Sequence, residues 1–363
     1  MTDRLRWTTT VPVVAVVALA FSWERTLPGA AVAVVALLLG GAVLAAVHHA
    51  DVIAGRVGEP FGSLVLALSV TIIEVALIVT LMVTGGSDKD TLARDTVFAA
   101  LMITCNGIVG LSLLFSTRGG RVAVFNAEGT GAALATIAAL ATLSLVLPTF
   151  TSSTPGPTFT TPQLTYAAIA SLTMYGLFVI MQTIRHRDQF LPAEVDVTDP
   201  TLAETEPDPT ASATALWPSV SLLLLALVGV VGLAKAISPT IESAVREARL
   251  PLGVVGVVIA ALVLLPESLA AVRSAKGGQV QTSMNLAYGS AMASIGLTIP
   301  AIAVASLWLE GPLKLGLGDT ELVLLALTVV VSILTVAPGR ATLLQGGIHL
   351  TLFAGFVVLA FSP

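Results

Sequence analysis

A chain of 363 residues with 55% hydrophobic and only 11% charged residues lies far from the soluble average, which excludes an ordinary soluble protein. The formal net charge of -5 is modest, and seven acidic residues lie in one loop, so nucleic acid is excluded as an expected partner. The lone Cys105 lies inside an apolar run, which excludes a disulfide framework and a thiol cluster for a soft metal. The composition predicts an all-α integral membrane protein whose surroundings are the lipid bilayer.

The first apolar segment, residues 11–23, has two interpretations. It follows Arg4 and Arg6 and contains Ala18 and Ala20 near a position where a signal peptide could be cleaved. We prefer an uncleaved leading helix. Either interpretation places the amino terminus on the cytoplasmic side, so the predicted topology does not depend on the choice.

Ten further apolar segments follow, each near the roughly 20 residues that one membrane-spanning helix needs. Turn or charge signals separate them. Five precede a polar stretch and five follow it, at residues 28–48, 61–84, 96–116, 129–148, 164–184, 217–237, 251–275, 284–309, 320–337 and 341–361. With the leading helix, the sequence predicts about eleven transmembrane helices.

The polar stretch from Arg185 to about Ala215 is acidic, contains proline and lacks helical periodicity of apolar residues, so it predicts a linker. In the predicted topology, ten Lys and Arg residues lie in loops on the side of the amino terminus and seven lie on the opposite side. Because cytoplasmic loops usually carry the excess of Lys and Arg, the amino terminus and this linker are expected in the cytoplasm. The expected organisation is an amino-terminal segment with the leading helix, a first five-helix repeat, an acidic cytoplasmic linker and a second five-helix repeat, at residues 1–27, 28–184, 185–216 and 217–363.

Two glutamates interrupt the apolar segments at mid-depth. Glu74 lies in the stretch Gly58 to Thr84, and Glu267 lies in the stretch Pro251 to Ala275. A charged side chain in hydrocarbon costs several kcal/mol, so such a residue usually faces the protein interior or a water-filled path and marks function. Each glutamate is in the second helix of its group of five. Because an odd number of spans inverts the second copy, we expect inverted repeats whose two glutamates converge near the midplane.

Oxygen-bearing residues near the glutamates suit a hard cation. Pro266 lacks an amide hydrogen and is expected to free the carbonyl of Leu262, and Thr71 lies one turn before Glu74. Carboxylate, amide, hydroxyl and carbonyl oxygens without thiols or a His cluster are what Ca²⁺ binds. The neighbouring third helices supply the other candidates, Thr104, Asn106, Gly107 and Gly110 in the first group and Asn285, Gly289, Ser290, Ser294 and Thr298 in the second.

Two carboxylates in one dry site also predict coupling to protons. Desolvation and mutual repulsion both disfavour the charged forms, so the site without a cation should hold protons. A cation must displace them, and the competition gives exchange if the empty, deprotonated site cannot reorient.

Two motif blocks carry a resemblance to a known family. They are GEPFGSLVLALSVTIIEV at Gly58 to Val75, and LLPESLAAVRSA with QTSMNLAYGSAMASIGLTIP between Leu264 and Pro300. The chain resembles the ChaA-type calcium/proton antiporters, a branch of the cation/Ca²⁺ exchanger superfamily, over nearly its whole length. The resemblance implies an eleven-helix fold with inverted repeats in the bacterial inner membrane. It also implies export of Ca²⁺, or of Na⁺ and K⁺ in some members, against inward protons, with no cofactor and with Glu74 and Glu267 as the essential acids.

One departure leaves the transported ion open. The wider superfamily often has Gly-Asn three to four residues before each glutamate, whereas this chain has Val70-Thr71 and Val263-Leu264. Two expected oxygen ligands are therefore missing. Monovalent export remains an alternative to Ca²⁺, with Asn106 and Asn285 as substitutes from the neighbouring helices.

Simpler interpretations stand beside the functional ones. Glu74 and Glu267 could be structural carboxyls, and Asn106 with the hydroxyl stripe of residues 290–298 could be packing positions. Glu59 is a candidate gate or pH sensor, but an acid near a helix start is also ordinarily favourable. His349 could relay protons or simply be packed, and the linker could sense cations or be a solvated tether.

Three function classes follow from these features. A secondary cation/proton antiporter leads, and a passive cation channel would share the buried carboxylates and hydroxyls. An enzyme is the third class, and the sequence argues against it because it has no HExxH pair, no GxSxG elbow and no GxxxxGK[ST] loop.

Overall fold

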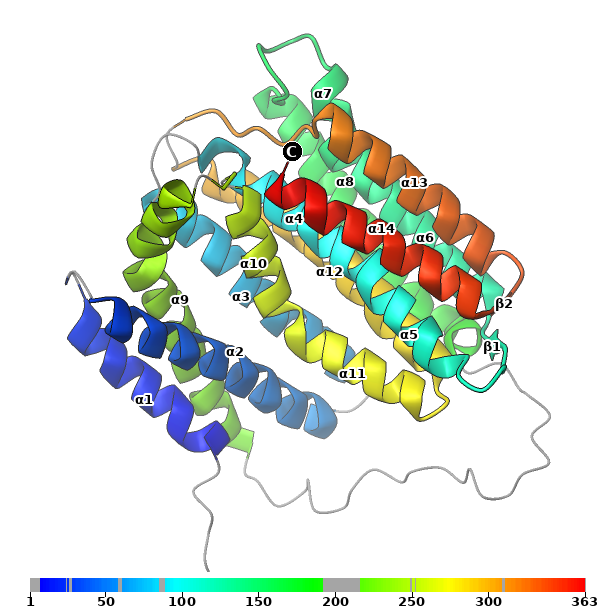
Figure 1. Ribbon diagram of the computed structural model, residues 1–363, viewed down its shortest axis with the longest axis horizontal. Coiled ribbons are helices and arrows are strands. Elements are labelled where there is room, and N and C mark those ends of the chain that lie inside the picture. The colour runs from blue at the N-terminus through cyan, green and yellow to red at the C-terminus, as the bar shows by residue number, and fades with distance from the viewer. Residues whose placement is uncertain are drawn as a thin grey trace, which may run out of the picture.

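The computed structural model describes residues 7–23, 25, 28–57, 61–84, 89–191, 216–248, 250–251, 253–308 and 311–362. Almost all of this described chain is helical (Figure 1). The apolar stretches are long and uninterrupted, and a helix satisfies every backbone polar group within the segment, which hydrocarbon requires.

The first half of the chain contains the leading helix and five further helical segments. Three of these are composite, because π-helical turns (η2, η3 and η4) interrupt or end them. The elements are α1 (Trp7–Ser22), α2 (Gly29–Val57), α3 (Phe61–Thr84), η1 (Lys89–Thr91), α4 (Leu92–Met102), η2 (Ile103–Ile108), α5 (Val109–Ser116), β1 (Ala123–Val124), α6 (Ala127–Ala141), η3 (Thr142–Val146), α7 (Leu147–Phe150), α8 (Thr161–Ile180), η4 (Met181–Arg185) and η5 (Arg187–Phe190).

The second half contains five more helical segments, the second of which is bent. The elements are α9 (Leu216–Glu247), α10 (Gly253–Val263), α11 (Leu265–Lys276), α12 (Val280–Ala305), α13 (Asp319–Val336), β2 (Arg340–Ala341) and α14 (Leu343–Phe361). Every predicted segment is thus helical. The largest difference is in α9, which was expected to end near residue 237 but continues through Pro239 to Glu247.

Eight helices in the described residues are long and apolar enough to span a membrane, and the pair α10 and α11 makes a ninth if it is one span. α1 and the apolar part of α3, Ser69–Thr80, are shorter. The multi-span helical fold is confirmed, and the full number of eleven spans stays a prediction.

The bend between α10 and α11 lies beside Pro266. The two axes differ by 53°, and Leu264 separates them. Pro266 occupies the first turn of α11, where amide groups have no intrahelical partner, so a missing amide costs nothing there. A new helix therefore begins directly before Glu267.

The third helical segments of the two groups form the centre of the molecule. The span Leu92–Ser116 is 89% buried and α12 is 61% buried, whereas α8 and α14 lie outside with 22% and 17% of their spans buried. The packing is reciprocal, because α3 contacts α12 while α10 contacts α4, and α8 contacts α12 while α14 contacts α5.

Two glycines allow the close approach of the outer helices. A Cβ built on Gly296 of α12 would lie 2.7 Å from Tyr175 of α8, and one built on Gly110 of α5 would lie 2.8 Å from Leu350 of α14. Neither position can carry a side chain without moving its neighbour. In each case the fifth helix of one group packs closely against a glycine in the third helix of the other group.

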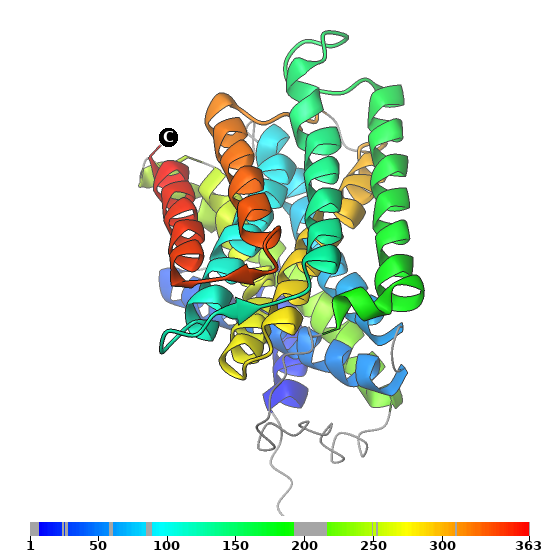
Figure 2. The same cartoon turned by 90° about the vertical axis from the view of Figure 1, so that its right-hand side faces the viewer.

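The loops repeat this reciprocity. β1, which follows α5, pairs antiparallel with β2, which precedes α14. An isolated antiparallel bridge joins Thr158, which precedes α8, to Lys314, which follows α12. Figure 2 shows the two strands at one end of α6 and α13, and the loops before α8 and after α12 at the other end. An inverted internal repeat would give this pattern, although the repeat itself stays a prediction.

Candidate cation site

Glu74 is buried in the middle of α3. Its side chain is only 3% exposed, and Ser294 Oγ of α12 donates a hydrogen bond of 2.6 Å to Glu74 Oε1. Thr71, one turn earlier, is also buried. The hydroxyl that donates to Glu74 therefore belongs to the polar stripe on α12, the third helix of the other group.

Glu267 lies in the first turn of α11, just after the bend. A carboxylate at a helix amino terminus is favoured by the unpaired amides and by the helix dipole. Its Oε2 atom is nevertheless buried and has no hydrogen-bond partner in the described part of the chain. A buried, unsatisfied carboxylate oxygen is costly, so it calls for a proton or a cation.

Both glutamates line one cavity of about 210 Å³. Five other candidates from the sequence line it too, namely Thr71, Asn285, Gly289, Ser290 and Ser294. The cavity ends at Thr282, near the start of α12, and at Gln182 and Thr183, near the end of α8. It therefore runs from mid-depth toward the side of the membrane that holds residues 185–191.

One wall of the cavity was missed by the sequence analysis. α8 contributes Tyr175, Phe178 and Val179, and the π-helical turn η4 that follows it contributes Gln182 and Thr183. The signal that could have found them is the polar pair Gln182-Thr183 at the end of an otherwise apolar segment.

The start of the predicted linker packs beside this cavity. Phe190 in η5 is buried, and its ring stacks edge-on against Phe178 with centroids 5.5 Å apart. Asn285 Nδ2 donates to the Phe190 carbonyl at 2.7 Å, and Asn285 Oδ1 accepts from Gln281 Nε2 at 2.9 Å. Residues 187–190 are thus part of the folded bundle, whereas the linker was expected to begin at residue 185.

Asn106 and His349 lie outside the cavity. Asn106 Nδ2 donates to Thr328 Oγ1 at 2.9 Å, and Asn106 Oδ1 lies 3.1 Å from His349 Nδ1. His349 Nε2 lies 3.1 Å from Thr335 Oγ1. All four side chains are buried, and they connect η2, α13 and α14. In this structure Asn106 is not a neighbour of the glutamates, in contrast to its expected place.

The remaining candidates take different positions. Thr104 Oγ1 donates to the Ala100 carbonyl of its own helix at 2.7 Å. Thr298 is buried and does not line the cavity, and Gly107 faces Phe353 of α14. Glu59 falls outside the described residues.

The cavity offers two carboxylates together with neutral hydroxyl and amide oxygens. No group of three or more His, Cys, Asp or Glu side chains that could hold a metal ion occurs among the described residues. Glu74 and Glu267 are the two carboxylates that line the cavity, so a cation there would balance its charge first against them. Oxygen ligands of this kind suit Ca²⁺ and other hard cations.

Known proteins resemble the chain over nearly its whole length. It is 43% identical over 360 residues to the putative ionic transporter y4hA of Sinorhizobium fredii, with 98% of this chain and 96% of that protein covered. It is 35% identical over 360 residues to the sodium-potassium/proton antiporter ChaA of Escherichia coli, with 97% and 95% covered.

The fold has a solved counterpart. The crystal structure of the H⁺/Ca²⁺ exchanger CAX superposes with a TM-score of 0.66 and 16% identity, covering 98% of this chain and 87% of that one. The profile of the sodium/calcium exchanger protein family matches residues 28–184 and 218–362. The chain belongs to the sodium/calcium exchanger protein family.

Proposed function

We propose that the protein is a secondary active cation/proton antiporter that carries no cofactor and catalyses no chemical reaction. The observation that supports this most directly is the cavity that both glutamates line, in which the buried Glu267 Oε2 has no hydrogen-bond partner among the described residues. One proton on each carboxyl, or one cation between them, would remove the cost of two buried charges.

The charges of the site set the coupling. When a Ca²⁺ ion replaces two protons on Glu74 and Glu267, the net charge in the cavity is unchanged. When one Na⁺ or K⁺ replaces one proton, it is unchanged as well. An empty site with both carboxylates ionised would be the most costly state, so it would cross between the two sides most slowly.

We propose inverted repeats and alternating access for the transport cycle. The repeat is supported by the reciprocal helix contacts, by the two loop pairings and by the two ranges of the family match. The cavity opens toward the start of the linker. With that linker in the cytoplasm of a bacterium and the protein in the inner membrane, the described state faces inward.

Ca²⁺ is the first candidate cargo, since two converging carboxylates match its charge. Na⁺ and K⁺ are the second, and two observations favour them. The relative at 35% identity is a sodium-potassium/proton antiporter, and Thr71 lines the cavity where the wider superfamily often has an asparagine.

Transport by purified protein in proteoliposomes tests this function. A pH gradient is imposed, and Ca²⁺, Na⁺ or K⁺ is added to the outside at matched ionic strength. We expect at least one of these ions to dissipate the gradient, and the ion that does so identifies the cargo. A passive channel would instead conduct the ion without any proton movement, and no coupled proton movement with any of the three would contradict the proposal.

A further inference from the structure

A pocket of about 580 Å³ lies where the loop that follows α5 meets the start of α14. It is lined by the last turn of α5, by the loop from Thr117 to Val122, and by Thr342 and Leu343. The pairing of β1 with β2 joins these two segments of chain directly beside the pocket. We call it the loop pocket, and we call the cavity that holds Glu74 and Glu267 the central cavity.

The loop pocket lies at the edge of the membrane-spanning segments. The span Leu92–Ser116 ends in it, and the span Leu343–Phe361 begins in it. Arg118 and Arg121 follow directly after the first of these spans. Their charges are therefore expected at the depth of the lipid headgroups, on the side of the membrane that holds residues 185–191.

A glycine turn brings the two arginines to one pocket. Gly119 and Gly120 have φ angles of 75° and 80°, which residues with a side chain rarely adopt. The chain therefore turns between Arg118 and Arg121, and both of these side chains line the pocket.

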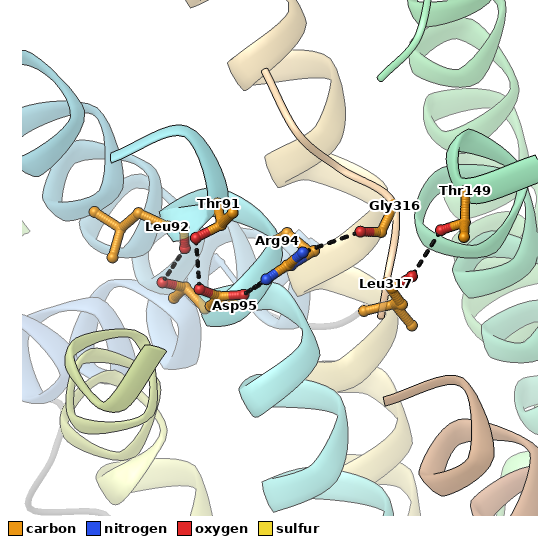
Figure 3. A network of polar contacts seen from close by, with 8 residues as sticks. Thr91, Leu92, Arg94, Asp95, Thr149, Gly316 and Leu317 are labelled. Atoms are coloured by element: carbon orange, nitrogen blue, oxygen red, sulfur yellow. Dashed lines mark hydrogen bonds and ion pairs between the residues drawn. The ribbon is translucent and has the colours of Figure 1, made fainter. Parts of the chain in front are cut away.

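The positive charges of the loop pocket have no acidic partner. Arg118 and Arg121 are exposed, and neither makes an ion pair with a carboxylate of the described chain. The opposite side of the membrane differs, because there the Arg94 guanidinium lies 2.7 Å from Asp95 Oδ1 and donates to the Gly316 carbonyl at 3.1 Å (Figure 3). The loop pocket thus keeps a positive potential that attracts anions.

A third cation lies beside the pocket at Phe115. The Arg118 guanidinium carbon is 5.7 Å from the centre of the Phe115 ring, and Lys276 Nζ is 4.4 Å from it. The ring quadrupole attracts both cations, so one aromatic side chain holds them close together without a carboxylate. Lys276 ends α11, and Ser116 Oγ of α5 donates to the neighbouring Ala275 carbonyl at 3.3 Å. The charges therefore converge at the end of α5.

Apolar side chains lie next to these charges and are not covered by the protein. Leu343 and Leu344, in the first turn of α14, are 53% and 69% exposed. In a membrane-spanning helix such side chains contact acyl chains. A soluble phosphate would use the charges of the pocket alone, whereas a phospholipid would use both the charges and this apolar surface.

We propose that the loop pocket binds an anionic phospholipid of the leaflet on the linker side. Its phosphate would lie between Arg118 and Arg121, and an acyl chain would lie along Leu343 and Leu344. Basic pockets between membrane-spanning helices bind anionic headgroups in this way. The chain's own acidic linker is the competing occupant, and the exposed leucines favour the lipid, since a linker segment rich in acids would not cover them.

Lipid binding by the purified full-length protein tests the proposal without any measurement of transport. Native mass spectrometry in detergent compares phosphatidylglycerol with phosphatidylcholine of the same acyl chains. We expect phosphatidylglycerol to bind at least fivefold more tightly, with a preference that weakens as salt is added. Arg118→Gln/Arg121→Gln should reduce the preference to less than twofold.

Arg185→Gln/Arg187→Gln is the matched control for this variant. It removes the same two charges from exposed positions on the same side, and neither residue lines the pocket. The preference of this control should stay within twofold of the parent. Equal losses in the two variants would overturn the proposal, and so would the absence of a preference in the unmodified protein, a result that depends on no variant.

Two further arms identify the occupant. If glycerol phosphate displaces phosphatidylglycerol at the concentration at which the lipid itself binds, the pocket is a phosphate site and the proposal is wrong. If the preference appears only after Glu204, Glu206 and Asp208 are replaced by their amides, the linker occupies the pocket and the proposal is wrong as well. Neither result bears on the antiport function.

Discussion

At the scale of single residues, the two carboxylates of the central cavity are not equivalent. Glu74 accepts a short hydrogen bond from Ser294, whereas Glu267 has a buried oxygen without a partner in the described chain. The sequence predicted both glutamates and Ser294, because a charged residue within an apolar segment and a hydroxyl stripe are visible without a structure. It could not predict which hydroxyl reaches which carboxylate.

Removal of the Ser294 hydroxyl is expected to weaken cation binding. A hydrogen bond to a charged group contributes about 1.5–3 kcal/mol, so Ser294→Ala should lower the cation affinity about tenfold or more at fixed pH. Ser290→Ala is the matched control, since Ser290 lines the same cavity and the structure gives it no hydrogen bond to a carboxylate. Equilibrium binding to purified protein measures both, and equal losses would contradict the assignment.

Asn106 illustrates what sequence reasoning could not supply. Its polar partners, Thr328 and His349, lie 222 and 243 residues away along the chain. An asparagine on the third helix of the first group looked like a cation ligand by position. The structure uses its amide to join three helices at the π-helical segment Ile103–Ile108.

The Asn106 network is expected to contribute to stability more than to transport. Asn106→Ala leaves the buried His349 Nδ1 and Thr328 without their partner, which costs about 1–3 kcal/mol. Thermal unfolding in detergent should show a lower midpoint, and exchange per folded protein should stay within about twofold of the parent. Thr136→Ala is the control that should leave the midpoint nearly unchanged, because this half-buried hydroxyl donates to the Ala132 carbonyl of its own helix. An unchanged midpoint with lost cation binding would restore Asn106 as a ligand.

At the scale of elements, apolar run length predicted all the helical segments, because the membrane thickness sets their length. Pro266 was expected only to free the carbonyl of Leu262, and the 53° bend at Leu264 was not predicted. The π-helical turns and the docking of Phe190 were not predicted. Both depend on contacts between helices that are far apart in the sequence, so no local sequence pattern predicts them.

The glycine contact between α8 and α12 gives a prediction at this scale. Gly296→Ala forces α8 outward at Tyr175, and overpacking of this kind typically costs about 1–3 kcal/mol. We expect a lower unfolding midpoint than for the parent. Gly289→Ala on the same helix is the control, because a Cβ there meets no atom within 4 Å. Equal midpoints for the two variants would contradict the close approach.

At the scale of the whole molecule, inverted topology was inferred from an odd number of spans in each group. The reciprocal contacts and loop pairings agree with that inference. What the sequence could not supply is which side the central cavity faces. That depends on how α3, α8, α11 and α12 are arranged at one moment of the cycle.

Competition between protons and cations predicts a pH dependence for the whole protein. Raising the pH removes protons from the carboxyl pair, so cation affinity should strengthen as pH rises through that range. The logarithm of the affinity should rise by at most about two per pH unit for Ca²⁺ and about one for Na⁺, since these ions displace two protons and one. Binding titrations across pH measure the slope, and a flat profile would count against shared carboxylates.

The central claim is that Glu74 and Glu267 carry both the cation and the protons. The most direct test is cation-driven proton movement in proteoliposomes with Glu74→Gln and Glu267→Gln, each shown to be folded, beside the exposed control Glu128→Gln. The account predicts that both cavity variants lose coupled proton movement while the control retains it. Near-normal exchange by both Glu74→Gln and Glu267→Gln would contradict it.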